Sequence, residues 1–524
     1  MTQLHLLWKN LKENFQGLGG WIAKTASFGK LAIVTPLVGS VWLIGQELRN
    51  DLVTIQPIAV PKTLSESGYT PEVAGYRLRD ALNTYTKASA TGDDGASLNP
   101  NANSVADDDD SLKSNFDLNI TADKELPDIV VPQLGLSIRA IAASIRSTLG
   151  MTRHAISGEL IGQDGKYALR LRIDGRQVSS RDYEAENPDR LMIPAASDVM
   201  DNIRPAALAM ARYRGQENEK AVLKADEIIA RYAKSDVNVQ WAYLLKGNYA
   251  LRQKQYNAAD QMFSNAVSSN RNSQQPHMQL GVSLLRQNRP IEAIKKFQDV
   301  LAINPKSAIA YNNIGVARAA QANLGNGETD QAKLEEAIAE YRRAIKADPS
   351  YVLPYNNLGL ALYYRNQIAE AIQQYQSAID ITPTYLAARG NLAYALRQRH
   401  INEGVAEYRD EAITEYRTAI KLAPGPKQQA ELHTFLGDFL RDFGESGNLE
   451  PAIAEYQQAI GINCYSWAHN NLGAIWEKQG KIQDAIAEYE KAKSCEPKDA
   501  AFENNLQRVR TQQASAITTG VANR

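Results

Sequence analysis

Small, apolar and aromatic residues recur at fixed spacings along the second half of the chain. In four places a Gly is followed twelve residues later by Ala, four residues after that by Phe or Tyr, and three further on by Ala or Val. In one copy these are Gly359, Ala371, Tyr375 and Ala378, with Pro383 after them, and three more copies share the back half of the pattern. Each copy predicts two helices whose apolar faces must be buried against neighbouring copies.

This pattern resembles the tetratricopeptide repeat, which has a small residue where its two helices touch, Ala and an aromatic residue on the second helix, and Pro at the end. The resemblance covers residues 239–499 in seven copies. It implies an all-α superhelix, with a degenerate helical cap at 214–238, a polar capping helix at 500–514 and a disordered tail at 515–524.

Asparagine pairs begin several first helices, as in the phrases YNNIG, YNNLG and HNNLG. Because Asn is a mediocre helix former, something other than propensity places it there. In the family that the repeats resemble, the second Asn of each pair faces the concave surface, which implies a ladder of carboxamides that holds the backbone of an extended peptide. The alternative is that these residues cap turns or bond within helices. The candidate peptide-binding residues are Gln279, Asn312, Asn313, Asn356, Asn357, Asn391, Asn470 and Asn471.

The N-terminal part predicts a membrane anchor. Residues 31–46 carry no charge and would extend about 24 Å as a helix, against a hydrocarbon core of about 30 Å; a buried helix is the alternative. Lysines precede this segment and acidic residues follow it, while residues 1–30 have the pattern of a cytoplasmic amphipathic helix. We therefore expect a single-pass protein of a bacterial inner membrane, with its N-terminus in the cytoplasm and its bulk in the periplasm.

Between anchor and repeats, strand and helix patterns alternate over residues 53–213, which predicts a small α/β sandwich. Residues 88–125, rich in Asp, Asn, Ser and Ala, predict a disordered insert in this domain. Two strand-helix units followed by the hairpin ISGELIGQDGKYALRLRIDG resemble the TolB amino-terminal-like domain of membrane-anchored bacterial repeat proteins. The fold class expected overall is multidomain: an N-terminal transmembrane helix, a small α/β sandwich and a C-terminal all-α superhelix.

Composition and motifs limit the chemistry. A net charge of -1 with 22% charged residues argues against a nucleic-acid partner. The two cysteines, Cys464 and Cys495, lie near the ends of successive second helices, so that either a disulfide or two buried thiols is compatible with the sequence. No phosphate loop, nucleophile elbow or zinc-protease motif is present, and His154 is a lone histidine. We expect no catalytic residue, no cofactor and no metal site.

Two functions from different classes fit these observations. The favoured one is a membrane-anchored protein-interaction scaffold whose repeats bind an extended peptide segment of a partner through the asparagines. The alternative is a ligand sensor or an enzyme that uses the α/β domain, with the repeats mediating assembly. A groove lined by Asn would favour the scaffold, whereas convergent acidic and basic side chains in a pocket of the α/β domain would favour the alternative.

Overall fold

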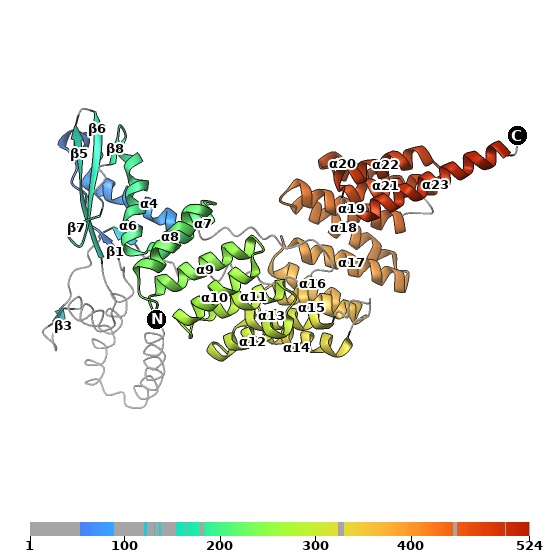
Figure 1. The fold of residues 1–524 in the computed structure, drawn as a ribbon, viewed down its shortest axis with the longest axis horizontal. Helices are drawn as coiled ribbons and strands as arrows, with labels where there is room; N and C mark the ends of the chain where they lie inside the picture. Colours follow the sequence, from blue (N-terminus) through green and yellow to red (C-terminus); the bar gives the residue numbers. More distant parts are fainter. Residues whose placement is uncertain are drawn as a thin grey trace, which may run out of the picture. The chain divides into compact units, whose positions relative to one another are not determined.

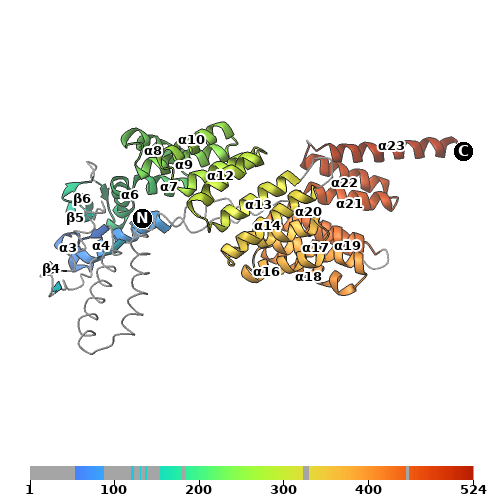
Figure 2. The ribbon, with the colours of Figure 1, turned by 90° about the horizontal axis from the view of Figure 1, so that it is seen from below.

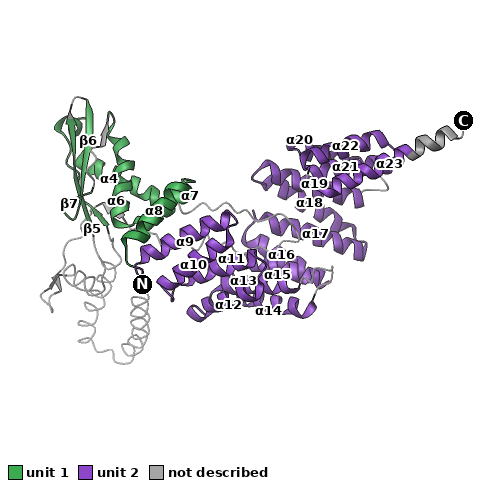
Figure 3. Ribbon diagram, viewed as in Figure 1, with its two compact units in different colours: residues 1–91, 112–233 green, residues 92–111, 234–524 purple. Residues whose placement is uncertain are grey.

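The described residues of the chain divide into two compact units. The computed structural model describes residues 53–87, 120–122, 130–131, 136–137, 154–163, 165–178, 183–322, 330–443, 448–497 and 499–522. The first unit comprises residues 1–91 and 112–233, and the second comprises residues 92–111 and 234–524 (Figure 3).

The prediction of an N-terminal transmembrane helix is corrected. Among the residues that the structure describes, none of the helices combines the length and the apolar character needed to cross a membrane. The segments predicted at 1–30 and 31–46 lie outside those residues. The uncharged stretch of about 24 Å is also short for a hydrocarbon core of about 30 Å. The membrane-anchored fold class and the inner-membrane location are withdrawn with it.

A mixed β-sheet forms the centre of the first unit. Strand β1 (Val53–Ile55) pairs in parallel with β2 (Ile120–Ala122) and with β5 (His154–Gln163), and β5 forms an antiparallel hairpin with β6 (Lys166–Ile173). The sheet order is β2-β1-β5-β6-β7, and β8 (Tyr183–Ala185) also pairs with β6. Strands β7 (Arg176–Gln177), β3 (Val130–Val131) and β4 (Leu136–Ser137) are short, and β3 and β4 pair only with each other.

Helices lie beside the sheet of the first unit and contact its strands (Figure 1). Alternation along β6 buries Leu169 and Leu171 while their neighbours are more exposed, and Ile156 and Leu160 of β5 are buried with them. The helices of this unit are α3 (Lys62–Glu66), α4 (Pro71–Lys87), a 3-10 turn η1 (Pro188–Leu191), α6 (Met192–Ile203), α7 (Pro205–Arg214) and α8 (Asn218–Arg231). Helix α8 packs on α7. It lies within residues 214–238, which the sequence predicts to cap the repeats.

Within the described residues of the second unit, helices α9 to α22 form seven consecutive pairs, and α23 follows them (Figures 1 and 2). The first helices of the pairs are α9 (Val237–Arg252), α11 (Gln274–Arg286), α13 (Ala308–Ala322), α15 (Leu353–Tyr364), α17 (Leu386–Glu403), α19 (Pro426–Phe443) and α21 (Ser466–Lys478). The second helices are α10 (Tyr256–Ser269), α12 (Pro290–Ile303), α14 (Gln331–Ala347), α16 (Ile368–Ile381), α18 (Ala406–Leu422), α20 (Glu450–Ile462) and α22 (Ile482–Cys495).

The recurring Gly and aromatic residues meet inside each pair. A methyl group placed on Gly359 would lie 2.6 Å from Cε1 of Tyr375, and one placed on Gly247 would lie 2.3 Å from Cε1 of Phe263. These aromatic side chains are buried, as are the alanines before them. The small residue is therefore required because the aromatic ring of the second helix lies directly against the backbone of the first.

Two sequence boundaries differ from expectation. Ile120–Ala122, inside the segment 88–125 predicted as a disordered insert, forms β2, because its β-branched residues pair with β1; the rest of that segment lies outside the described residues. Helix α23 (Ala500–Ala522) continues through most of the tail predicted as disordered, since no proline interrupts it (Figure 2). The other domain boundaries, and the resemblance of residues 53–213 to the TolB amino-terminal-like domain, stay predictions.

Candidate functional site

The first helices of neighbouring pairs contact one another, as α13 does with α15 and α15 with α17. The candidate asparagines lie on these helices. Counting the small residue of each first helix as the eighth position, Asn312, Asn356 and Asn470 occupy the fifth position and Asn313 and Asn357 the sixth. The asparagine side chains are therefore placed at the boundary between one pair and the next.

Hydrogen bonds link these carboxamides from one pair to the next. Each bond runs from Nδ2 of a sixth-position Asn, or of its counterpart in α23, to Oδ1 of the fifth-position Asn in the preceding pair. The bonds join Asn357 to Asn312 at 2.9 Å, Asn391 to Asn356 at 2.8 Å and Asn505 to Asn470 at 2.8 Å. We call this set of bonds the amide ladder.

Further bonds extend the amide ladder along its first helices. Asn312 donates Nδ2 to Oδ1 of Asn313 at 3.1 Å, and Asn313 donates in turn to Sδ of Met278 at 3.5 Å. Asn470 likewise donates to Oδ1 of Asn471 at 3.1 Å. Neither helix capping nor bonding within one helix accounts for the ladder, because its repeating bonds cross between successive pairs.

The predicted site residues are largely inaccessible to solvent. Asn312, Asn313 and Asn357 are 0% exposed, Asn356 is 1% exposed and Asn391 is 5% exposed. Gln279 and Asn470 are also buried, whereas Asn471 is half-buried. In this conformation a peptide backbone would have to displace existing inter-repeat bonds to reach most of them. The peptide-binding role of these residues stays a prediction.

The amide ladder is interrupted from α17 to α21, because Asn471 of α21 donates to Asp438 of α19 and not to a fifth-position Asn. The fifth position of α17 is Gly390, which has no side chain, and the sixth position of α19 is Phe435, which has no amide. A pocket of about 250 Å³ opens at this interruption. Its lining residues are Gly390, Tyr394, Arg397, Tyr416, Phe435, Asp438, Phe439, Arg441 and Asp442.

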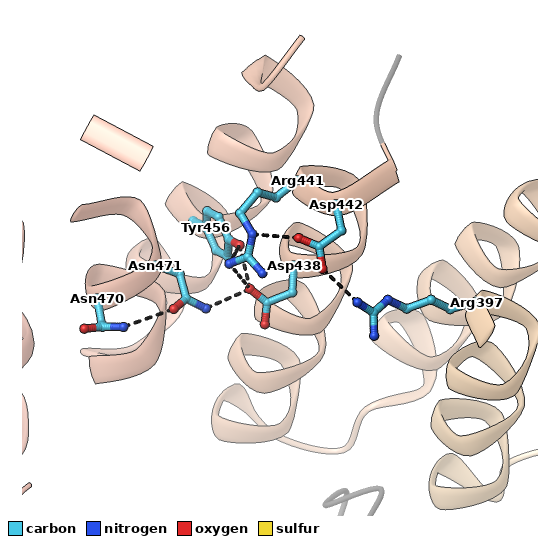
Figure 4. A network of polar contacts seen from close by, with 7 residues as sticks. All are labelled: Arg397, Asp438, Arg441, Asp442, Tyr456, Asn470 and Asn471. Atoms are coloured by element: carbon cyan, nitrogen blue, oxygen red, sulfur yellow. Dashed lines mark hydrogen bonds and ion pairs between the residues drawn. The ribbon is translucent and has the colours of Figure 1, made fainter. Parts of the chain in front are cut away.

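A network of charged side chains forms one side of this pocket (Figure 4). Arg397 of α17 donates Nη2 to Oδ2 of Asp442 on α19 at 2.8 Å, which ties the two first helices together. Arg441 donates Nε to Oδ1 of Asp442 and Nη1 to Oδ1 of Asp438, both at 3.0 Å. The two arginines and two aspartates therefore balance one another's charge.

Asp438 connects the pocket to the end of the amide ladder. Its Oδ1 accepts hydrogen bonds from the Tyr456 hydroxyl at 2.6 Å and from Nδ2 of Asn471 at 2.8 Å (Figure 4). Burial raises the pKa of Asp438 above its ordinary value, and the negative charge of Asp442 adds to this effect. The hydrogen bonds from Tyr456 and Asn471 and the positive charge of Arg441 offset it only in part. The carboxylate is thus held by several donors rather than being free for acid-base chemistry.

Aromatic rings continue from the pocket onto neighbouring first helices. The guanidinium of Arg397 lies 5.8 Å from the ring centre of Tyr394 and 5.2 Å from that of Phe443, distances at which a cation and a ring attract each other. Tyr394 in turn lies 5.3 Å from Tyr363 of α15, measured between ring centres. Tyr364, next to Tyr363, is 44% exposed. The arrangement offers apolar and aromatic surface with a polar edge.

His154 of the first unit has a structural partner. Its Nδ1 lies 2.7 Å from Oδ2 of Asp174, and Oδ1 of Asp174 accepts the backbone N–H of Ala155 at 2.9 Å. Asp174 adopts a left-handed backbone conformation, with φ of 51°. The pair fixes the first residues of β5 against the turn that follows β6.

Sequence reasoning identified Phe435 as a break in the asparagine pattern but did not identify the pocket. The pocket also depends on the fifth position of α17, which is Gly390, whereas the fifth position of the preceding first helix, α15, is Asn356. The two exceptions remove the bond of the amide ladder between α17 and α19, and Gly390 also leaves out the volume of an Asn side chain. This coincidence could have been found from the aligned repeats.

Tetratricopeptide-repeat family models match the second unit. A model described as TPR repeat matches residues 325–364 and 359–398, and one described as tetratricopeptide repeat matches residues 244–308 and 438–500. A search of curated proteins finds no significant match.

Several solved structures resemble part of the chain. A thermophilic TPR protein of Thermus thermophilus is 20% identical over 38% of this chain and 98% of its own, with a TM-score of 0.32. A tetratricopeptide repeat protein from Parabacteroides merdae is 15% identical over 53% and 100%, with a TM-score of 0.38. YrrB, described as a TPR protein with an unusual peptide-binding site, is 22% identical over 35% and 88%, with a TM-score of 0.27.

The helix pairs, the small residue under each aromatic ring and the two matching family models agree along the second unit. The second unit therefore contains tetratricopeptide repeats, which the family models match at residues 244–308, 325–398 and 438–500.

Proposed function

We propose that this protein is a protein-interaction scaffold whose repeats bind a peptide segment of a partner at the pocket between α17 and α19. Tetratricopeptide-repeat proteins bind protein or peptide partners, and this general role is the basis of the proposal. The observation that carries it is the pocket at Gly390 and Phe435, where the amide ladder is interrupted.

The size and lining of the pocket favour a single bulky side chain of the partner. Its volume of about 250 Å³ is below the roughly 300–1,000 Å³ typical of small-molecule sites. The rings of Tyr394, Phe435 and Phe439 provide apolar surface, while Arg397 and Asp442 are paired with each other at its edge. An aromatic or large aliphatic anchor is therefore favoured over a charged one, whose burial would require a free counter-charge.

In this proposal the asparagines do not contact the peptide. They hold successive pairs in register, and the pocket replaces them as the contact for the peptide. The wider role predicted for Asn313, Asn357 and Asn391 requires a groove conformation in which their amides are accessible, and their burial is evidence against it. Among the described residues of the α/β unit, no specific observation favours the alternative function, and His154 is engaged with Asp174.

The pocket can be filled without disturbing the fold. A Cβ on Gly390 would meet no atom within 4 Å, and Gly390 lines the pocket, so Gly390→Leu should place its side chain in the pocket. Gly461→Leu, in α20, is a matched control because its Cβ also meets nothing within 4 Å. Both changes replace a helical Gly and should stabilise the helix by about 0.5–1 kcal/mol.

Peptides selected from a random library on the wild-type chain provide the probe. We expect those that bind with micromolar or better affinity to carry an aromatic or aliphatic anchor and to bind Gly390→Leu at least tenfold more weakly than Gly461→Leu. Equal affinity for the two variants would place peptide binding elsewhere on the repeats and would contradict the proposal.

A further inference from the structure

Two cysteines and a histidine come together in the last helix pair. Cys464 lies in the connection before α21, His469 lies on α21, and Cys495 is the last residue of α22. One potential ligand atom from each residue lies within 4.8 Å of those from the other two. The cysteines form a disulfide in this structure, with their Cα atoms 5.9 Å apart. Neither the peptide pocket nor the amide ladder uses these side chains.

We propose that Cys464, His469 and Cys495 bind a divalent metal ion of the Zn²⁺ type when the disulfide is reduced. Two thiolates and one imidazole are a ligand set that suits Zn²⁺, and a water molecule would complete the tetrahedral coordination. The disulfide and the metal use the same sulfur atoms. The last pair is therefore closed either by a covalent bond or by a metal ion, according to the redox state.

The imidazole of His469 is held in place by a neighbouring carboxylate. Its Nδ1 lies 2.6 Å from Oε2 of Glu488, and Lys491 donates Nζ to the other oxygen of that carboxylate at 2.8 Å. A carboxylate that accepts the Nδ1 proton leaves the lone pair on Nε2, which is the arrangement found around many zinc-binding histidines. The side chain of His469 is only 7% exposed, so its ring is held by packing as well.

The two cysteine residues are more exposed than His469. Cys464 is exposed and Cys495 is half-buried, so that a reductant and a metal ion can reach them from solvent. A dithiol supplies two electrons and two protons to the disulfide, which becomes two thiols while the dithiol becomes a disulfide. The metal ion then displaces both thiol protons to solvent and binds the two thiolates with Nε2 of His469.

An equivalent histidine in the preceding pair has no cysteines beside it. His433 of α19 lies 2.6 Å from Oε2 of Glu455 through its Nδ1, which reproduces the His469–Glu488 contact one pair earlier. Only His469 belongs to a cluster with two sulfur atoms among the described residues. His433 is therefore a matched control for the effect of removing a His–Glu contact without removing a ligand.

Cobalt uptake by the full chain, prepared without a histidine tag, tests the proposal. After reduction with a phosphine and its removal under nitrogen, titration with Co²⁺ should give one equivalent bound per chain, with thiolate-to-cobalt absorption that Zn²⁺ abolishes. The disulfide form should bind no Co²⁺ with this spectrum. Glu488→Gln should weaken binding by about 10- to 100-fold, because a neutral carboxamide is a weaker acceptor for the Nδ1 proton than the carboxylate.

Ligand variants identify the site. Cys495→Ser and His469→Ala should each weaken Co²⁺ binding at least tenfold and change the absorption, whereas His433→Ala should bind as the wild type does. Circular dichroism of each variant monitors folding, and Cys495→Ser retains the His469–Glu488 contact if His469→Ala does not fold. Absence of uptake by the reduced wild type, or uptake that survives Cys495→Ser unchanged, would overturn the proposal.

Discussion

Nδ2 of Asn391 donates a hydrogen bond to Oδ1 of Asn356, 2.8 Å away, across the boundary between two helix pairs. Both side chains are buried, so this bond forms where water cannot replace it. The same bond recurs between α13 and α15 and between α21 and α23, and at these boundaries it specifies how far one helix is displaced along its neighbour. Packing of apolar side chains alone would allow one helix pair to shift along the next, and the hydrogen bonds of the amide ladder oppose this shift.

The first prediction concerns one bond of the amide ladder. Asn357→Ala leaves Oδ1 of Asn312 without its donor at a site that is 0% exposed. An unsatisfied buried acceptor costs about 1–3 kcal/mol, which exceeds the gain in helix propensity from Asn to Ala. We expect the free energy of unfolding to fall by that amount, measured by urea denaturation followed by circular dichroism.

Asn402→Ala is the control for this change, because Asn402 is an exposed residue of α17. It should leave stability within about 0.5 kcal/mol of the wild type. A triple variant in which Asn313, Asn357 and Asn391 are replaced by Ala should be less stable than the wild type in the absence of peptide. A triple variant that melts like the wild type but no longer binds peptide would instead support direct contact between the asparagines and the peptide.

The second prediction compares two glycines of first helices. Gly359→Ala would place its Cβ 2.6 Å from Cε1 of Tyr375, whereas Gly390→Ala would place it in open space. We expect the former to destabilise the repeats by about 1–3 kcal/mol and the latter to stabilise them by up to about 1 kcal/mol. Thermal unfolding of both variants measures the difference. Equal melting temperatures would show that the Tyr375 ring moves aside without cost.

The repeats could be predicted from the sequence because each copy satisfies the same local requirement. Gly359 and Tyr375 are separated by a fixed spacing, and the contact between them lies within a single helix pair. The roles of Asn356 and Asn391 could not be predicted in this way, since they depend on the displacement between pairs. A pattern of positions shows that the asparagines share a face, but only the structure shows that they bond to one another.

The same limit applies to the pocket and to the cysteines. Gly390 and Phe435 face each other only after α17 and α19 are placed side by side. Cys464 and Cys495 are 31 residues apart, and their sequence positions made a disulfide conceivable but did not predict it over two buried thiols. The packing of α21 on α22 brings them together and adds His469.

The third prediction concerns the disulfide. Closing a loop of 31 residues restricts the unfolded chain and should stabilise the last pair by about 3–4 kcal/mol. In buffer that contains a chelator, reduction should therefore increase hydrogen exchange of the amides in α21 and α22. Amides of α11 and α12 are an internal control, because stability in stacked repeats is transmitted mainly between neighbours. Unchanged exchange in α21 after complete reduction would contradict this expectation.

The last prediction is a pH dependence that arises from Glu488. Burial raises the pKa of this carboxyl, but the hydrogen bonds and charges of His469 and Lys491 outweigh it and hold the pKa below its ordinary value of 4.5. The folded chain therefore binds the proton less readily than the unfolded chain, and the carboxylate contributes stability that is complete above pH 4.5 and is lost as the pH falls through the folded value.

Replacing Glu488 by Gln should lower the free energy of unfolding by about 1–3 kcal/mol near neutral pH. That difference from the wild type should shrink steadily below pH 4.5, because the wild-type carboxyl then becomes protonated and is neutral, as the Gln side chain is. Glu490→Gln on the same helix is the control, since the Glu490 side chain is 50% exposed and should contribute little at any pH. Urea denaturation at a series of pH values would measure all three chains, and a difference for Glu488→Gln that stays constant into acid would show that hydrogen bonding alone, without the charge, accounts for its effect.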